Sequence, residues 1–285
     1  MTDRDTLLQR NIRRRKNTDN ILVNCSRFVR ILPYLWKERH KASLRPFFEG
    51  TTFRLSKRRR LRLCVFTNAW KFIKSVFSTT ERIDGTRLRF PLATRPWWPS
   101  DDFSRLLETN IEGIRSEFLR LELQLRDHPN TSSLVASGKW SIIPLFKGGR
   151  KCKDCTAAPR TVGLIESSRH CCLGGDGIGQ AVFSVLTPGT CIKEHQGSVN
   201  VRIRYHLCLE VEDGAEVDTL GMRVAGAART WKKGECVAFD DSFMHSVWHH
   251  GQSRRVVLMV DLWHPDLSNE ERDFAIVVSE VLLGA

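Results

Sequence analysis

Apolar and polar residues alternate in short runs over the second half of the chain, as they do in strands with one buried face. β-Branched and aromatic residues are common in these runs, and Gly, Pro and Asp residues lie between them. The pattern predicts strands at 181–186, 201–211, 221–225, 235–239, 245–249 and 255–263. Several short strands without intervening helices predict a sandwich or barrel, a class that includes the jelly rolls.

Helical patterns flank these strands. Apolar residues recur at helical spacing over 103–121, and Ser100 or Asp101 can cap this helix at its N-terminus. The tetrapeptide SNEE at 268–271 is a capping box that predicts a last helix. Between the first helix and the β-rich half, two further short strands are expected at 141–146 and 161–165.

The positive charge of the chain is concentrated in its N-terminal part. The formal net charge is +13, and residues 1–80 hold 20 of the 45 Lys and Arg but only 5 of the 32 Asp and Glu. The remaining residues are therefore nearly neutral. We predict two parts: a basic arm at 1–80, which is a solvated tail or binds an anionic membrane surface, and a folded domain at 95–285.

Several classes of protein are disfavoured by what the sequence lacks. Nucleic-acid binding is a weak alternative, because no recognition motif accompanies the basic arm. The most apolar stretch of the arm, 61–77, contains three basic residues, so neither a spanning helix nor a signal peptide is expected. Cys152 and Cys155 form a CxxC motif without a second such motif, which favours a loop disulfide or free thiols over structural zinc.

Two histidines, His195 and His245, lie at the edges of predicted strands, where a jelly roll can bring distant residues together. A lone histidine in such a place is usually a surface residue, but these two have notable neighbours. Arg255 begins an otherwise apolar strand ten residues after His245, and an arginine facing inward there needs an anion. His249 and His250, by contrast, are predicted to lie on opposite faces of a strand end at the surface.

Three segments together resemble the aspartyl/asparaginyl β-hydroxylase family of Fe(II)- and 2-oxoglutarate-dependent dioxygenases: SVLTPGTCIKEHQGSVNVRIRYHL, FDDSFMHSVWH and RRVVLMVDLWHPDLSNEE. The resemblance covers roughly 95–268, and KCKDCTAAPRTVGLI and MVDLWHP are similar to its aspartate β-hydroxylase domain-containing branch. It implies a double-stranded β-helix (jelly roll) with flanking helices. It also implies hydroxylation of an Asp or Asn side chain in a protein substrate, coupled to the conversion of 2-oxoglutarate to succinate.

Carried over position by position, the resemblance makes His195 and His245 the iron ligands. It assigns the 2-oxoglutarate carboxylates to Ser184 and Arg255 at one end and to Arg204 and His206 at the other, and it assigns the acidic substrate side chain to Arg202. These residue types suit the chemistry, because neutral imidazole binds Fe(II) and a guanidinium holds a carboxylate with two hydrogen bonds.

Two positions are notable within this resemblance. Gly197 stands where many iron oxygenases have the aspartate of His-x-Asp, and the family shares this glycine. Glycine leaves a coordination position for water, which Asp240 or Asp241 can orient, and Gly197→Asp is expected to rebuild the commoner triad. Val135 stands where the hydroxylase has a substrate-binding arginine, so the resemblance implies the cofactors but leaves the substrate open.

Two other functions therefore stay open: a non-catalytic jelly-roll binding module, and a surface binder that acts through the basic arm. Family members work in the secretory pathway as membrane proteins, which implies the endoplasmic reticulum, but the sequence itself leaves the compartment open. If the arm is separate from the chemistry, deletion of 1–80 should leave iron binding intact and abolish salt-dependent binding to anionic vesicles or polynucleotides. A truncated chain that cannot fold would show that the boundary is wrong.

Overall fold

The computed structural model of the chain describes residues 92–168, 170–171, 178–269, 272 and 275–276. By its internal contacts the chain divides into two units, 1–79 and 80–285, and the described residues belong to the second. The basic arm predicted at 1–80 lies outside the described residues, so its role stays a prediction. None of the helices in the described part of the chain is both long and apolar enough to span a membrane.

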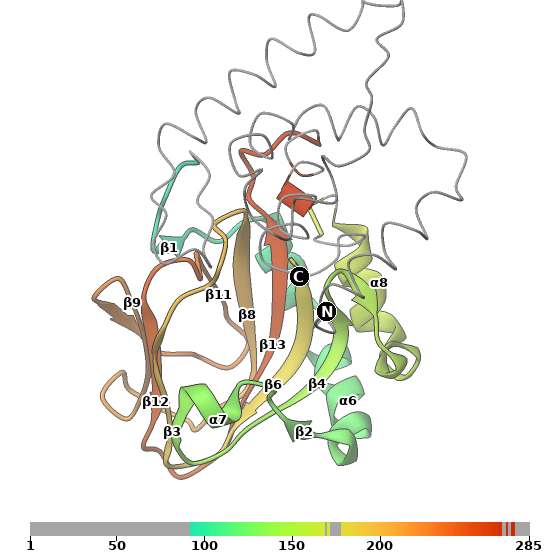
Figure 1. Cartoon of the computed structure of the whole chain (residues 1–285). Helices are drawn as coiled ribbons and strands as arrows, with labels where there is room; N and C mark the ends of the chain where they lie inside the picture. Colours follow the sequence, from blue (N-terminus) through green and yellow to red (C-terminus); the bar gives the residue numbers. More distant parts are fainter. Residues whose placement is uncertain (1–91, 169, 172–177, 270–271, 273–274, 277–285) are drawn as a thin grey trace, which may run out of the picture. The chain divides into compact units, whose positions relative to one another are not determined.

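The described residues form two antiparallel sheets that face each other, which is the predicted double-stranded β-helix (Figure 1). The large sheet has the strand order β1 (Trp97–Trp98), β11 (Cys236–Phe239), β8 (Arg202–Glu210), β13 (Arg255–Trp263), β6 (Gln180–Leu186), β4 (Trp140–Lys147) and β2 (Arg126–Asp127), with β5 (Arg150–Lys151) paired to β4. The small sheet has the order β10 (Ala227–Arg229), β9 (Leu220–Val224), β12 (His245–His249), β7 (Thr190–His195) and β3 (Val135–Ser137).

Each long strand of the large sheet separates two kinds of environment. On β8, Ile203, Tyr205 and Leu207 point outward into a core shared with the helices, whereas Arg204 and His206 point into the space between the sheets. The rest of the inner space is lined by apolar side chains of both sheets, including Trp140, Ile142, Val182, Ile192, Met222, Val247 and Met259. The polar residues on the inner face are therefore unusual, because they are buried among apolar side chains.

The predicted first helix is two helices, α5 (Asp102–Thr109) and α6 (Ile111–Leu121). Asp101 caps α5, because its carboxylate accepts the backbone N–H of Ser104 at 2.8 Å. The break lies at Asn110, whose backbone is not helical and whose side chain donates to the carbonyl of Leu106. The described residues of the predicted last helix, 269, 272 and 275–276, are helical.

The prediction of a strand at 161–165 is wrong, because this segment lies in the helix α8 (Pro159–Ser167). The β-branched residues there favoured a strand, but a carboxylate from another helix caps the segment. Glu117 on α6 is buried and accepts hydrogen bonds from the backbone N–H groups of Arg160 and Thr161 at 2.8 Å. A negative charge at the first N–H groups stabilises a helix, and α6 and α8 lie together along the outer side of the large sheet (Figure 1).

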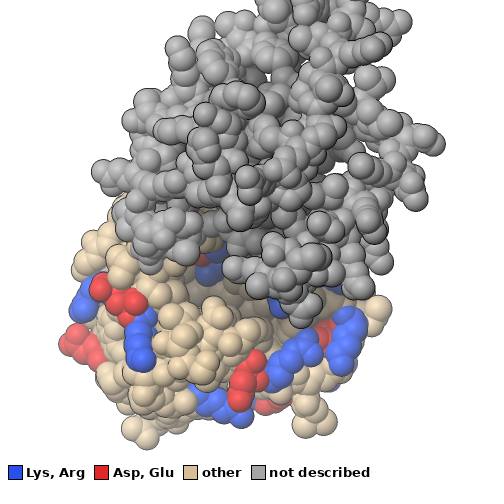
Figure 2. Space-filling view, viewed as in Figure 1, with Lys and Arg blue, Asp and Glu red and all other residues tan. Residues whose placement is uncertain are grey.

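The outer surface of the domain carries no strong charge of one sign on the face shown in Figure 2. There, Lys and Arg side chains lie among Asp and Glu side chains, with uncharged surface between them. Several charged residues of the described domain form ion pairs, such as Lys151 with Glu166 at 2.9 Å.

Candidate metal and anion site

His195 and His245 lie opposite each other on neighbouring strands of the small sheet. His195 ends β7, His245 begins β12, and the two are Cα partners in the ladder. Their ring centroids are 4.1 Å apart, with 52° between the ring planes. The structure thus brings together two residues that are fifty positions apart in the sequence.

Both rings are held in the same way. The Nδ1 atom of His195 lies 2.8 Å from the carbonyl oxygen of Lys193, and that of His245 lies 2.8 Å from the carbonyl oxygen of Phe243. A carbonyl oxygen only accepts, so each Nδ1 carries the proton and each Nε2 keeps its lone pair. This backbone contact is the usual support of a metal-binding histidine, because it fixes the tautomer and the ring orientation.

Burial keeps both imidazoles neutral. It lowers the pKa of His245 to about 4, and it also lowers the pKa of His195. A ring whose pKa lies below its ordinary value is neutral at pH 7, and a neutral imidazole is the form that binds a metal. The pair is therefore prepared for a cation, although no cluster of three or more His, Cys, Asp or Glu side chains suited to a metal occurs in the described ranges.

A carboxylate from another position in the chain, that of Asp241, occupies the space beside Gly197. A Cβ atom on Gly197 would lie 2.8 Å from both carboxylate oxygens of Asp241, so this side chain fills the space beside the glycine. The backbone N–H of Gly197 also donates to the carbonyl of Asp241 at 2.7 Å. Of the two aspartates considered from the sequence, Asp241 is the one that lies next to Gly197.

Asp241 belongs to a buried group of four charges with Arg202, Arg204 and Asp261. Arg202 donates to Asp241 through Nη2 at 2.7 Å, and Arg204 donates to Asp261 through Nε at 2.7 Å and Nη2 at 3.0 Å. Arg204 Nη1 also lies 3.0 Å from Asp241. Burial alone would raise the pKa of Asp241, but the two arginines hold it below the ordinary range, so the aspartate is charged.

The positions of Arg202 and Arg204 refine their predicted roles. Arg204 faces the inner space, but Asp261, its Cα partner on β13, already holds its guanidinium with two hydrogen bonds. Arg202 is similarly engaged by Asp241 and the carbonyl of Ile178. Each arginine is thus fixed in direction before any ligand arrives, and Asp261 is a residue that the sequence reasoning missed.

Arg255 lies at the other end of the inner space. We call this the arginine end, and the end with His195 and His245 the histidine end. The Arg255 side chain is 3% exposed, and its Nη2 donates to the Ser184 hydroxyl at 3.3 Å. Its guanidinium carbon lies 4.8 Å from the ring centroid of Trp231, and its Nε has no hydrogen-bond partner among the described residues.

A buried guanidinium without a carboxylate is costly, and Arg255 shows this cost. Burial lowers its pKa to about 10, and no ion pair with Arg255 is found within the described ranges. Ser184 also accepts the indole N–H of Trp140 at 3.0 Å, which leaves its own hydroxyl proton available to a further acceptor. The arginine end is therefore a site that an anion would complete.

His206 lies on the inner face of β8 between the two ends. Its ring packs against Trp231, 6.0 Å between centroids, and against the edge of Phe239. Neither ring nitrogen has a hydrogen-bond partner in the described part of the chain, and burial lowers the pKa of the ring well below its usual value. An unpartnered polar ring in this position points to a missing ligand. Ser184, His206 and Arg255 thus line one inner face, which begins at the histidine end with Arg204.

One histidine was misplaced by the sequence reasoning. His250 is exposed as expected, but His249 is fully buried, because the inward alternation of β12 runs through His245, Val247 and His249. The phase of the strand, counted from His245, would have revealed this. Trp140 and Trp231, which contact Ser184 and Arg255, were not predicted as site residues.

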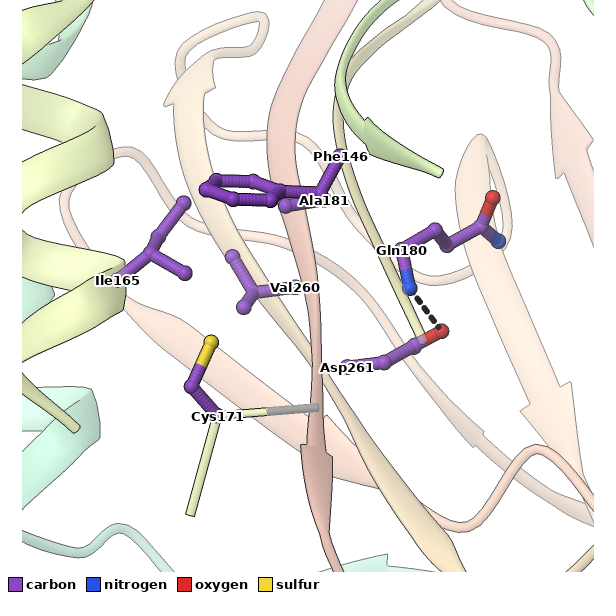
Figure 3. A pocket seen from close by; sticks show the side chains of 7 residues that line it. All are labelled: Phe146, Ile165, Cys171, Gln180, Ala181, Val260 and Asp261. Atoms are coloured by element: carbon purple, nitrogen blue, oxygen red, sulfur yellow. Dashed lines mark hydrogen bonds between the residues drawn. The ribbon is translucent and has the colours of Figure 1, made fainter. Parts of the chain in front are cut away.

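Two other sequence features lie away from this site. Cys152 and Cys155 are free thiols, and the Cys155 thiol donates to the carbonyl of Leu145, so no disulfide joins them. A small cavity between α8 and the large sheet is lined mainly by apolar side chains, with Cys171 and Asp261 at its edge (Figure 3). Its lining includes none of the predicted ligands, and we regard it as a packing gap.

The close approach of Asp241 changes the expectation for substitutions at Gly197. Gly197→Asp would force a second carboxylate against Asp241, so it is not a simple repair of the triad. Even Gly197→Ala should lower the free energy of unfolding by about 1–3 kcal/mol, because a contact of 2.8 Å requires the carboxylate or the backbone to move. Gly163→Ala on α8 is the matched control, since a Cβ there meets nothing within 4 Å. Equal stability of the two variants in denaturant titrations would contradict this account.

Comparison with known proteins agrees with this geometry. Residues 108–265 match the family described as Aspartyl/Asparaginyl beta-hydroxylase. The chain is 38% identical over 198 residues to aspartate beta-hydroxylase domain-containing protein 2 of Rattus norvegicus, which covers 64% of this chain and 54% of that protein. It is 34% identical over 190 residues to aspartyl/asparaginyl beta-hydroxylase of Homo sapiens, covering 64% and 24%. The chain therefore spans about half the length of the first relative and a quarter of the second.

Solved structures with a similar arrangement include a Pseudomonas putida prolyl-4-hydroxylase, with a TM-score of 0.37, 18% identity and coverage of 61% of this chain and 95% of that one. Another is a 2OG-Fe(II) oxygenase family oxidoreductase from Burkholderia pseudomallei, with a TM-score of 0.35, 11% identity and coverage of 65% and 98%. These likenesses are distant, and the sequence match is the stronger finding. Because that match extends over more than half of its length, the chain belongs to the aspartyl/asparaginyl β-hydroxylase family.

Proposed function

We propose that the protein is an Fe(II)- and 2-oxoglutarate-dependent dioxygenase that hydroxylates an Asp or Asn side chain of a protein substrate. One observation carries the proposal. The two histidines with free Nε2 lone pairs lie at one end of the inner space, and Arg255, a buried arginine with no counter-ion among the described residues, lies at the other. A dicarboxylate such as 2-oxoglutarate would extend from a metal at the histidine end to Arg255 at the arginine end.

The residues present fit both groups. His195 and His245 would hold iron through Nε2, and Arg255 with Ser184 would hold the far carboxylate of 2-oxoglutarate. When bound, iron and 2-oxoglutarate use oxygen to hydroxylate a C–H bond, with release of succinate and carbon dioxide. Apolar inner walls, including Met259 and Val257, keep water away from this chemistry.

The four buried charges have separate tasks in this proposal. Asp261 fixes the direction of the Arg204 guanidinium, so that Arg204 and His206 would face the near end of 2-oxoglutarate. Asp241, in the space beside Gly197, would accept a hydrogen bond from water next to the metal and so orient that water. Arg202, which also contacts Asp241, would meet the substrate side chain.

The test has two steps with the full chain. Anaerobic titrations with Fe(II) and then 2-oxoglutarate should show that the second binds only after the first. Succinate release should then rise in the presence of peptides that contain Asp or Asn, and His195→Ala should abolish it. If the wild-type chain binds no iron, the proposal is wrong.

A second candidate function is a binding module that keeps the cofactors without hydroxylating. The observation that favours it is Val135, a half-buried apolar residue on β3 where the resemblance places a substrate-binding arginine. This alternative predicts tight binding of iron and 2-oxoglutarate but no peptide-dependent succinate release. Introducing Val135→Arg should then restore release if that arginine is the missing element.

A further inference from the structure

A second polar side chain, His249, is buried at the arginine end. His249 lies at the last position of β12, on the same inner face as His245, and its side chain has no exposed surface. A histidine buried to this extent usually has hydrogen bonds at both nitrogens. Here the two nitrogens differ.

One nitrogen of the His249 ring is engaged and the other is not. The backbone N–H of Gly251 donates to Nδ1 at 3.3 Å, whereas Nε2 has no hydrogen-bond partner among the described residues. Because Nδ1 accepts, the proton of the neutral ring lies on Nε2. Burial lowers the pKa of His249 and the charge of Arg255 adds to this effect; together they outweigh a backbone hydrogen bond with Ser253 that raises the pKa, so the ring is neutral at pH 7. Although the ring also contacts the Ser253 backbone, its Nε2–H has no acceptor among the described residues.

The strand pairing places this donor near Arg255. Leu186 is the Cα partner of Arg255 in the large sheet, and Thr190, four residues later, is the Cα partner of His249 in the small sheet. The intervening turn is tied to β12, because the N–H of Gly189 donates to the carbonyl of His249 at 2.7 Å. Two unsatisfied donors, Arg255 Nε and His249 Nε2, thus lie at one end of the inner space, on facing sheets.

We propose that His249 is a second binding residue for the anion that Arg255 holds, donating from Nε2 to the carboxylate of 2-oxoglutarate that lies farther from the iron. This inference rests on the proposed function. It explains why a histidine is buried here without a partner, since the acceptor is supplied by the ligand. Two donors on opposite sheets would also fix the plane of the carboxylate, which a single guanidinium on one sheet does less well.

The test is anaerobic calorimetry of 2-oxoglutarate binding to the Fe(II)-loaded full chain. His249→Leu should weaken 2-oxoglutarate binding by about tenfold or more, as expected for loss of a hydrogen bond to a charged group. His249→Gln should keep most of the affinity, because its amide nitrogen reaches the place of Nε2, and His249→Asn should not. His250→Leu is the matched control on the exposed neighbour and should bind like the wild type.

The outcomes separate this inference from the proposed function. If Arg255→Ala loses 2-oxoglutarate binding while His249→Leu retains it, the role of His249 is overturned and the dioxygenase proposal stands. If His249→Gln weakens binding as much as His249→Leu, the residue acts only by packing and the inference is again wrong. If the wild-type chain binds iron but no 2-oxoglutarate, both proposals fail.

Discussion

Replacing His195 by alanine is expected to lower the affinity for Fe(II) by more than about 100-fold, because loss of a side chain that merely orients a ligand already costs about 10- to 100-fold. His195 would supply one of two protein ligands, so no other described side chain can take its place within the small sheet. The affinity can be measured by anaerobic titration with Fe(II). The fold should survive, since the Nδ1 contact to Lys193 is a single hydrogen bond at a strand end.

The control for this experiment is His250→Ala. His250 is exposed and follows β12, so the change removes an imidazole without touching the histidine end. Its iron affinity should equal that of the wild type. An unchanged affinity in His195→Ala would mean that iron binds elsewhere, and the assignment of the two histidines would have to be abandoned.

Replacement of Arg255 by methionine should have opposite effects on 2-oxoglutarate binding and on the stability of the unliganded protein. Binding should weaken by about 2–5 kcal/mol, because a buried charge pair with the carboxylate is lost. Without ligand, the variant should unfold at the same or a higher temperature, since Arg255 is a buried cation without an ion pair among the described residues. Calorimetry of the ligand and thermal unfolding of the protein measure the two effects.

A matched comparison is Arg254→Met on the preceding residue. Arg254 pairs with Glu210 at 2.8 Å and with Glu122 at the surface of the domain, so its loss should lower stability slightly and leave 2-oxoglutarate binding unchanged. If Arg255→Met instead destabilises the unliganded protein more than Arg254→Met does, Arg255 is part of the structural core and the anion site is wrong.

Strand positions were predictable from the sequence, because burial of one face repeats every two residues. β12 and β13 have the predicted bounds, and β6, β8, β9 and β11 differ from the predicted ranges by one residue at one or both ends. No bounds were predicted for β7 and β10. The helix α8 was not predictable, because its cap is Glu117, more than forty residues away. Local helix and strand propensities do not include the effect of a carboxylate that reaches the segment only through the tertiary structure.

Only part of the candidate site was likewise predictable from the sequence. The resemblance and the strand edges indicated His195 and His245, and the inward arginine on an apolar strand indicated Arg255. The pairing of Arg204 with Asp261 joins residues 57 positions apart, and the place of Asp241 beside Gly197 depends on a loop that follows β11. Such contacts depend on the register between strands, and this register cannot be predicted residue by residue from the sequence.

The facing of His195 and His245 across β7 and β12 also bears on how the domain folds. Fifty positions of the sequence separate His195 from His245, and the register of the ladder between β7 and β12 shifts between His245 and Val247. Pairing strands so distant along the chain is slow and entropically unfavourable, so this ladder should close late. A cation bound by both imidazoles would link β7 to β12 and stabilise their pairing. Without metal, the pairing of these two strands should open more often. Amide hydrogen exchange of the iron-free protein should therefore be faster along β7 and β12 than along the other strands.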